Sequence, residues 1–115
     1  MEVNELKDLI IESLKDAKTD KITVINVKEQ TSLADYMVII SLSNHKATKS
    51  TSLMLEEKME KHNIKATRID GYDEGRWIVV DYSDIIVHIF NQETLGFYQL
   101  EKLWSTDENV EIINI

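Results

Sequence analysis

Apolar residues recur every three or four positions in some segments of the chain and alternate or run together in others. The first spacing is typical of amphipathic helices and the second of strands. The spacing predicts a helix over residues 4–18. A second, long helix begins after Ser43 and Asn44, which are good N-cap residues, and ends near Asn63. The other predicted elements are strands at residues 22–27, 36–41, 65–70, 77–81 and 85–90, and one or two short helices around residues 97–104.

The order of these elements predicts an α/β fold. A strand, the long helix and a short strand follow one another over residues 36–70, which favours a right-handed βαβ crossover and a partly parallel sheet. Two apolar runs around Tyr82 and Ser83 are close enough in the chain to predict an antiparallel hairpin. The second run, Ile85–Phe90, does not alternate, which is typical of a strand covered on both faces. We therefore expect one small domain with a mixed five-stranded sheet and flanking helices.

His88 stands out because it lies inside an apolar strand. If Tyr82 and Ser83 are the two loop residues of the hairpin, the pairing places Trp77 directly opposite His88. The favoured interpretation is a hydrogen-bonded core histidine, and the alternative is a histidine that faces a partner. A catalytic base would need an adjacent nucleophile, and the sequence offers none that can be named.

The length and composition agree with a single globular domain. The chain has 115 residues, of which 43% are hydrophobic, and no apolar run approaches the roughly 18 residues of a membrane span. It has no cysteine, which excludes disulfides and thiolate chemistry, and its first residues resemble neither a signal peptide nor a transit peptide. We expect a cytoplasmic protein. The domain is expected over residues 1–106, followed by an acidic, β-prone tail over residues 107–115 that is a frayed end, an added edge strand or a dimer contact.

The charge of the chain is negative and unevenly distributed. The net charge is −8, yet residues 1–66 contain 10 basic and 11 acidic side chains, whereas residues 67–115 contain 3 basic and 10 acidic ones. The second half therefore has a net charge of −7. Such a chain should be repelled by phosphate backbones and attracted by a basic protein surface. Little direct contact with RNA is expected.

Four aspartates fall near the ends of predicted strands, where nucleotidyl-transferring enzymes hold metal ions: Asp35, Asp70, Asp81 and Asp84. The turn at residues 42–44 has no glycine to approach a phosphate, so strand-end caps on a solvated surface are the favoured interpretation. A two-metal site in a metal-dependent, nucleotidyltransferase-like enzyme is the alternative. His45 and His62 lie at opposite ends of the long helix, too far apart to share a metal. We expect no enzyme activity, no cofactor and no metal.

Large aromatic residues and acidic residues are interleaved in the second half of the chain. Each aromatic residue fills the core by default, but the combination also suits an interface with aromatic anchors and a charged rim. The best candidates for anchors are Trp77, Tyr82 and Tyr98, whereas Trp104 is a further aromatic of this region. The candidate partner-binding residues are Trp77, Asp81, Tyr82, Asp84, His88, Glu93, Tyr98 and Glu101.

Three segments resemble the ribosomal silencing factor family, whose members are also called Iojap-like proteins. They are Thr31–Ile39, Trp77–Phe90 and Phe97–Trp104, and their order and spacing agree with the family across about residues 3–106. The Trp77–Phe90 segment is the most specific of the three. The chain departs from the family pattern at Leu42 and Leu95, where the family usually has a glycine-containing turn and an arginine.

The resemblance implies a small α/β domain that is related in fold to nucleotidyltransferases but lacks their activity. Members of this family bind the large ribosomal subunit through its ribosomal protein numbered fourteen. The bound factor blocks joining of the small subunit and so represses translation when nutrients are short. The resemblance also implies a cytoplasmic location and is compatible with a homodimer. The acidic second half independently fits docking on a basic ribosomal protein.

Overall fold

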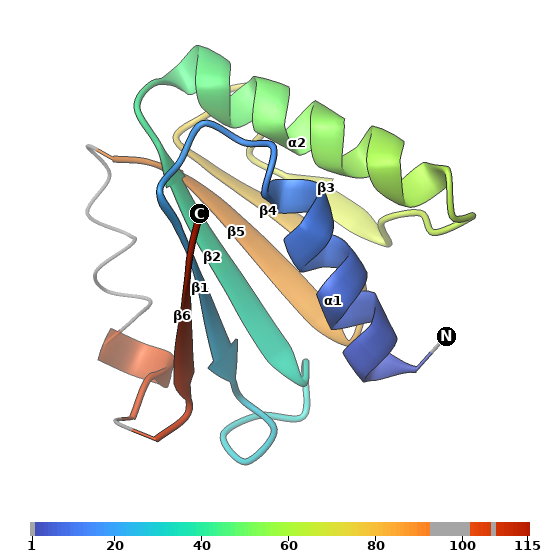
Figure 1. The fold of residues 1–115 in the computed structure, drawn as a ribbon, viewed down its shortest axis with the longest axis vertical. Helices are drawn as coiled ribbons and strands as arrows, with labels where there is room; N and C mark the ends of the chain where they lie inside the picture. Colours follow the sequence, from blue (N-terminus) through green and yellow to red (C-terminus); the bar gives the residue numbers. More distant parts are fainter. Residues whose placement is uncertain (1, 93–101, 107) are drawn as a thin grey trace.

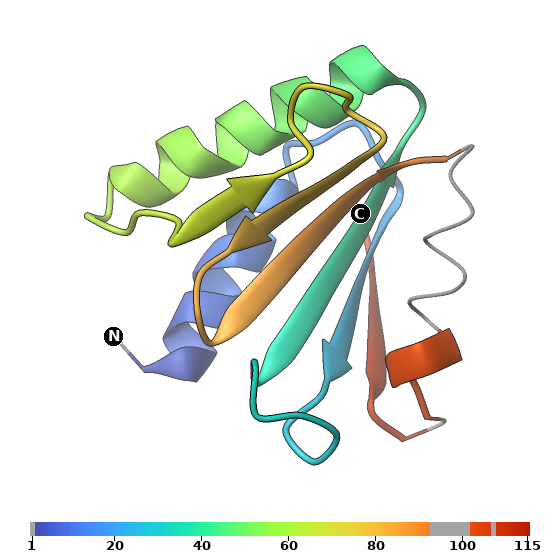
Figure 2. The same cartoon turned by 180° about the vertical axis from the view of Figure 1, so that it is seen from behind.

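The computed structural model describes residues 2–92, 102–106 and 108–115. Figure 1 shows helices α1 and α2 packed side by side on one face of a sheet, and Figure 2 shows the sheet from the opposite face. This arrangement confirms the predicted α/β class. The elements are α1 (Val3–Leu14), β1 (Lys21–Asn26), β2 (Tyr36–Leu42), α2 (His45–Glu60), β3 (Arg68–Asp70), β4 (Trp77–Asp81), β5 (Ile85–Asn91) and β6 (Val110–Asn114).

The sheet is mixed, as predicted, but it has six strands in the order β3-β4-β5-β2-β1-β6. Strands β2 and β5 pair in parallel and all other neighbours are antiparallel. The prediction of five strands was wrong because Val110–Asn114 pairs with β1 and forms an edge of the sheet. Of the three alternatives for the last residues, the structure shows the added edge strand. The helix α2 leads to β3 at the opposite edge, so the parallel neighbour of β2 is β5 and not β3.

The main core lies between the sheet and the two helices. Ile10 and Leu14 of α1 and Leu55 and Met59 of α2 are fully buried against alternate residues of the strands. The N-terminus of α2 is capped as predicted, because the Ala47 amide donates to the Asn44 side chain at 2.8 Å. Helix α1 is shorter than predicted and ends at Leu14, after which the Ala17 amide donates to the Leu14 carbonyl in a tight turn.

The hairpin between β4 and β5 forms as predicted, but its register differs by two residues. The turn residues are Ser83 and Asp84, since the Tyr82 amide donates to the Ile85 carbonyl at 2.9 Å. Ser83 adopts a left-handed φ of 69°, and its amide donates to the Asp81 carboxylate at 2.7 Å. This local bond stabilises a turn without glycine. The predicted pairing of Trp77 with His88 was therefore wrong.

The two-residue shift leaves side chains on their predicted faces because the side-chain period of a strand is two. Trp77 pairs with Phe90, and Val79 pairs with His88. Trp77 and His88 are diagonal neighbours on the same face of the sheet. Strand β5 is buried on both faces along most of its length, as its continuous apolar run predicted.

Candidate interaction surface

The face of β4 and β5 that points away from α1 and α2 contains the most prominent aromatic group of the described structure. We call it the Trp77 surface, and it comprises Trp77, Val79, Asp81, Ile86, His88 and Phe90. The alternate residues Ile78 and Val80 of β4 are fully buried on the helix side. Figure 2 shows the sheet from the side on which the Trp77 surface lies.

Trp77 is exposed, but its position is determined by two contacts. Its side chain is 41% exposed, whereas Phe90 beneath it is fully buried. The two rings stack with centroids 5.1 Å apart and planes inclined by 26°. The indole Nε1–H donates to Nδ1 of His88 at 3.0 Å. The ring is therefore held by stacking on one neighbour and by a hydrogen bond to another.

His88 is a buried, neutral histidine. It is 5% exposed, and desolvation lowers the pKa of its imidazole to about 4. Since Nδ1 accepts the indole proton, the neutral ring has its own proton on Nε2. That Nε2 has no hydrogen-bond partner within the described part of the chain. The favoured prediction of a hydrogen-bonded core histidine thus agrees with the contacts at Nδ1.

Gly71 sets the path of the chain into Trp77. It has φ of +83°, and a Cβ placed on it would lie 2.1 Å from the Trp77 carbonyl oxygen. A side chain at this position would therefore collide with backbone atoms of the residue that carries the exposed indole. The turn from Gly71 to Gly75 is also closed by a bond from the Gly75 amide to the Gly71 carbonyl at 3.0 Å.

Tyr82, which is predicted to be a surface anchor, lies in the core. Its side chain is 5% exposed and belongs to the cluster on the helix side of the sheet. Burial first, and the charges of Glu56 and Glu60 second, raise the pKa of the Tyr82 hydroxyl. Tyr82 follows β4 at a position whose side chain points to the helices, so it is not available as an exposed anchor. His88 is too deeply buried to be an anchor itself.

The acidic candidates have different surroundings. Asp81 is half-buried and accepts the Ser83 amide, whereas Asp84 is exposed and its backbone carbonyl accepts the Asp35 amide at 2.7 Å. Asp70 forms an ion pair of 2.8 Å with Arg68. Within residues 2–92, 102–106 and 108–115, no three Asp, Glu or His side chains are grouped so that they could hold a metal ion.

Some of the predicted interface falls on residues that the structure does not describe. Glu93, Leu95, Tyr98 and Glu101 lie outside the described residues. Trp104 is half-buried and packs against the second, smaller cluster of the core, which includes Phe90.

Sequence reasoning missed several exposed apolar side chains of the described residues, namely Leu33, Leu53, Leu103, Ile112 and Ile115. The alternation in β6 is the signal that could have indicated Ile112, because its neighbour Ile113 packs on the core. No helix of the described chain is both long and apolar enough to span a membrane.

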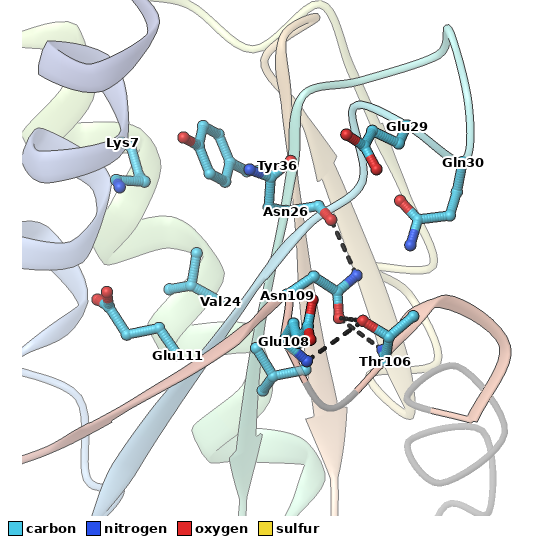
Figure 3. A pocket seen from close by; sticks show the side chains of 11 residues that line it. Lys7, Val24, Asn26, Glu29, Gln30, Tyr36, Thr106, Glu108, Asn109 and Glu111 are labelled. Carbon is cyan, nitrogen blue, oxygen red and sulfur yellow. Dashed lines mark hydrogen bonds between the residues drawn. The ribbon is translucent and has the colours of Figure 1, made fainter.

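A separate hollow of about 530 Å³ lies between α1, β1, β2 and the residues that lead into β6 (Figure 3). Its lining combines the cation of Lys7 with carboxylates such as Glu111. Asn109 is part of the lining, and its Nδ2 donates to the Asn26 carbonyl at 2.9 Å while its Oδ1 accepts from Thr106. The bond to Asn26 attaches the start of β6 to β1, so these residues of the lining have a structural role.

Comparison with known proteins identifies the family. The family model described as "Ribosomal silencing factor during starvation" matches residues 1–115. The chain belongs to the ribosomal silencing factor family. The resemblance in the three sequence segments is thereby confirmed, and the ribosome is where members of this family act.

The relatives of this family member match most of its length. The ribosomal silencing factor RsfS of Halalkalibacterium halodurans is 29% identical over 97% of this chain and 96% of its own. The mouse "Mitochondrial assembly of ribosomal large subunit protein 1" is 31% identical over 85% of this chain and 44% of its own. A crystal structure of protein CV0518 from Chromobacterium violaceum superposes with a TM-score of 0.84 at 25% identity, over 95% of this chain and 92% of that one.

Proposed function

We propose that this family member binds the large ribosomal subunit through its ribosomal protein numbered fourteen and that the Trp77 surface makes the contact. The bound chain then blocks joining of the small subunit and represses translation. Family membership supports action on the ribosome. A relative named for assembly of the mitochondrial large subunit favours that subunit as the partner.

The observation that carries the proposal is an exposed tryptophan on a rigid support. Trp77 is 41% exposed, and both Phe90 and His88 hold its ring in one orientation. Tryptophan is enriched among the residues that dominate binding energy, particularly where the ring has little freedom to lose on binding. A buried support and an exposed ring are the features expected of such an anchor.

The charge around β4 favours a basic partner. Asp73 and Glu74 are exposed in the turn before Trp77, and Asp84 is exposed in the turn after the strand. Arg68 and Arg76 offset part of this charge, so residues 68–84 contain 5 acidic and 2 basic side chains, a net charge of −3. The second half of the chain has a net charge of −7 in total. Such a field steers association with basic protein surfaces and opposes contact with RNA phosphates. We infer that direct RNA contact is slight. Separately, similarity to a bacterial ribosomal silencing factor supports the proposal that the protein acts in the cytoplasm.

Inhibition by this route needs occupancy and no chemistry. A standard interface covers about 800 Å² of each partner, which is roughly an eighth of the 6860 Å² accessible surface of this chain. Most of the domain would then project from the large subunit and occupy space that the small subunit needs. This role requires neither a cofactor nor a metal.

The strand β6 is the site at which we propose that two copies would pair, since it is the edge strand beyond β1. Its exposed Ile112 would lie in the contact. Sedimentation equilibrium would test this. A wild-type mass of two copies that falls to one in Ile112→Lys would support the pairing, and a wild-type mass of one copy would contradict it.

The proposed function is tested by mixing purified large subunits with the chain and then adding small subunits in a sucrose gradient. We expect the protein to sediment with large subunits and the fraction of joined ribosomes to fall. Trp77→Ala should lose both effects. Leu53→Ala is the matched control, because Leu53 is 50% exposed on α2, on the opposite side of the sheet. Absence of binding at physiological salt, or binding without any effect on joining, would overturn the proposal.

A further inference from the structure

We propose that His88 is a positioning residue that holds the Trp77 indole in the orientation in which it meets the partner. This inference rests on the proposed function of the Trp77 surface. His88 is buried and does not itself touch the partner. It affects how tightly the partner binds through the ring that it positions.

The described surroundings of His88 are apolar. Its cross-strand neighbours are Ile39 of β2 and Val79 of β4, and all three side chains lie on the same face of the sheet. The Phe90 ring also lies beside it, with centroids 6.2 Å apart. Burying an imidazole among such apolar side chains costs free energy unless its polar atoms are hydrogen-bonded. Within the described part of the chain its Nε2 has no such partner. Among the described residues, the side-chain hydrogen bond of His88 is therefore the one at Nδ1.

The one bond that His88 makes through Nδ1 is directed at the exposed aromatic ring. Nδ1 accepts from the indole Nε1–H at 3.0 Å, and the two ring centroids are 5.9 Å apart. An indole nitrogen can only donate, so an acceptor at this place selects the ring orientation that points the N–H at it. Phe90 restricts the plane of the ring by stacking, but a flip of about 180° about χ2 keeps that plane and turns the N–H away. The two contacts together determine both the plane and the direction.

Fixing the Trp77 ring before binding should raise the affinity for the partner. A side chain that is already in its bound orientation loses less conformational freedom on association, which for one aromatic side chain corresponds to roughly a twofold to tenfold gain in affinity. The bond also satisfies a polar atom that would otherwise need water at the edge of the contact. His88→Leu should therefore weaken binding by that factor while the partner-facing atoms remain unchanged.

Two substitutions at this position separate positioning from packing. His88→Leu removes the acceptor and keeps an apolar filling. His88→Asn places an amide oxygen close to the position of Nδ1 and keeps the acceptor. In each variant we would record the indole N–H resonance of Trp77 in the free protein and the dissociation constant for large subunits. The indole of Trp104 is an internal control.

His88→Leu should shift the Trp77 indole resonance upfield, speed its exchange with solvent and weaken binding roughly twofold to tenfold. His88→Asn should restore most of both. Equal binding by His88→Leu and wild type would overturn the inference and leave the proposed function intact. Equal weakening in the two variants would indicate a packing effect and would also overturn it. Absence of wild-type binding would overturn both proposals.

A double-mutant cycle tests the bond without relying on the buried position alone. Trp77→Phe keeps an aromatic ring on Phe90 but removes the indole N–H. If His88 acts by accepting that proton, His88→Leu should have no further effect on binding in the Trp77→Phe background. Additive losses from the two substitutions would contradict a positioning role.

Discussion

The indole of Trp77 stacks on the fully buried ring of Phe90, with centroids 5.1 Å apart. An exposed residue of β4 thus rests on a core residue of β5, and the two belong to different environments although they touch. Phe90 also lies in the smaller core cluster with Ile25 and Ile39. The contact connects the stability of the sheet to the presentation of the surface.

Truncating Phe90 and truncating Trp77 should have different effects on the free energy of unfolding. Phe90→Ala should lower the free energy of unfolding by roughly 3 to 5 kcal/mol, because it leaves a cavity under both β4 and β2. Trp77→Ala should cost less, roughly 2 kcal/mol, because the residue is 41% exposed and buries only part of its ring. Urea unfolding followed by circular dichroism measures both. A loss for Trp77→Ala as large as that for Phe90→Ala would contradict the surface placement of Trp77.

Gly71 should tolerate no side chain. In Gly71→Ala the new Cβ would meet the Trp77 carbonyl at 2.1 Å, and φ of +83° adds strain. We expect a loss of roughly 2 kcal/mol or more in the free energy of unfolding, together with a changed fluorescence of Trp77. Asp73→Ala in the same turn, where the residue is exposed, is the control and should cost less than about 0.5 kcal/mol. Similar losses in the two variants would show that the turn is not constrained in this way.

The buried imidazole should make stability depend on pH. Burial lowers the pKa of His88 from 6.5 to about 4, so the unfolded chain binds a proton at this residue between these values and the folded chain does not. Stability is fully present above pH 6.5 and falls as the pH drops toward 4, by about 3 kcal/mol from this residue. His88→Asn should lack this component. The free energy of unfolding would be measured by urea titration at several pH values between 7 and 4. If it fell equally with pH in wild type and in His88→Asn, the burial of His88 would be contradicted.

The two neighbouring isoleucines of β6 should respond differently to a charge. Ile113 packs on the main core, whereas Ile112 is 51% exposed on the other face. Ile113→Asp should lower the free energy of unfolding by roughly 2 kcal/mol or more, and Ile112→Asp by less than about 1 kcal/mol. Equal tolerance of both substitutions in a denaturant titration would mean that β6 is not bound to β1 in solution.

Local patterns predicted most of the fold. The apolar spacing and the Asn44 cap located the long helix α2, and the continuous run at Ile85–Phe90 indicated a strand buried on both faces. The proximity of Trp77 and His88 also followed from the hairpin, since a register error of two residues keeps side chains on the same face.

The predictions were wrong where the structure depends on turn geometry, long-range strand pairing or helix packing, which the spacing of apolar residues does not indicate. The hairpin register depends on Ser83 adopting a left-handed conformation that is stabilised by Asp81. The strand β6 depends on pairing with β1, more than eighty residues earlier in the chain. The sequence alone does not place Tyr82, because an amphipathic aromatic side chain suits both the surface and the core. Only the packing of α2 over the sheet decides between them.

The most direct test of the account is equilibrium binding of the fluorescently labelled chain to the purified ribosomal protein numbered fourteen. Wild type, Trp77→Ala and Leu53→Ala would be compared at several salt concentrations. We predict that Trp77→Ala binds at least about tenfold more weakly than wild type, that Leu53→Ala binds like wild type, and that affinity falls as salt rises. Wild-type affinity in Trp77→Ala, or the same loss in both variants, would contradict the claim that the Trp77 surface makes the contact.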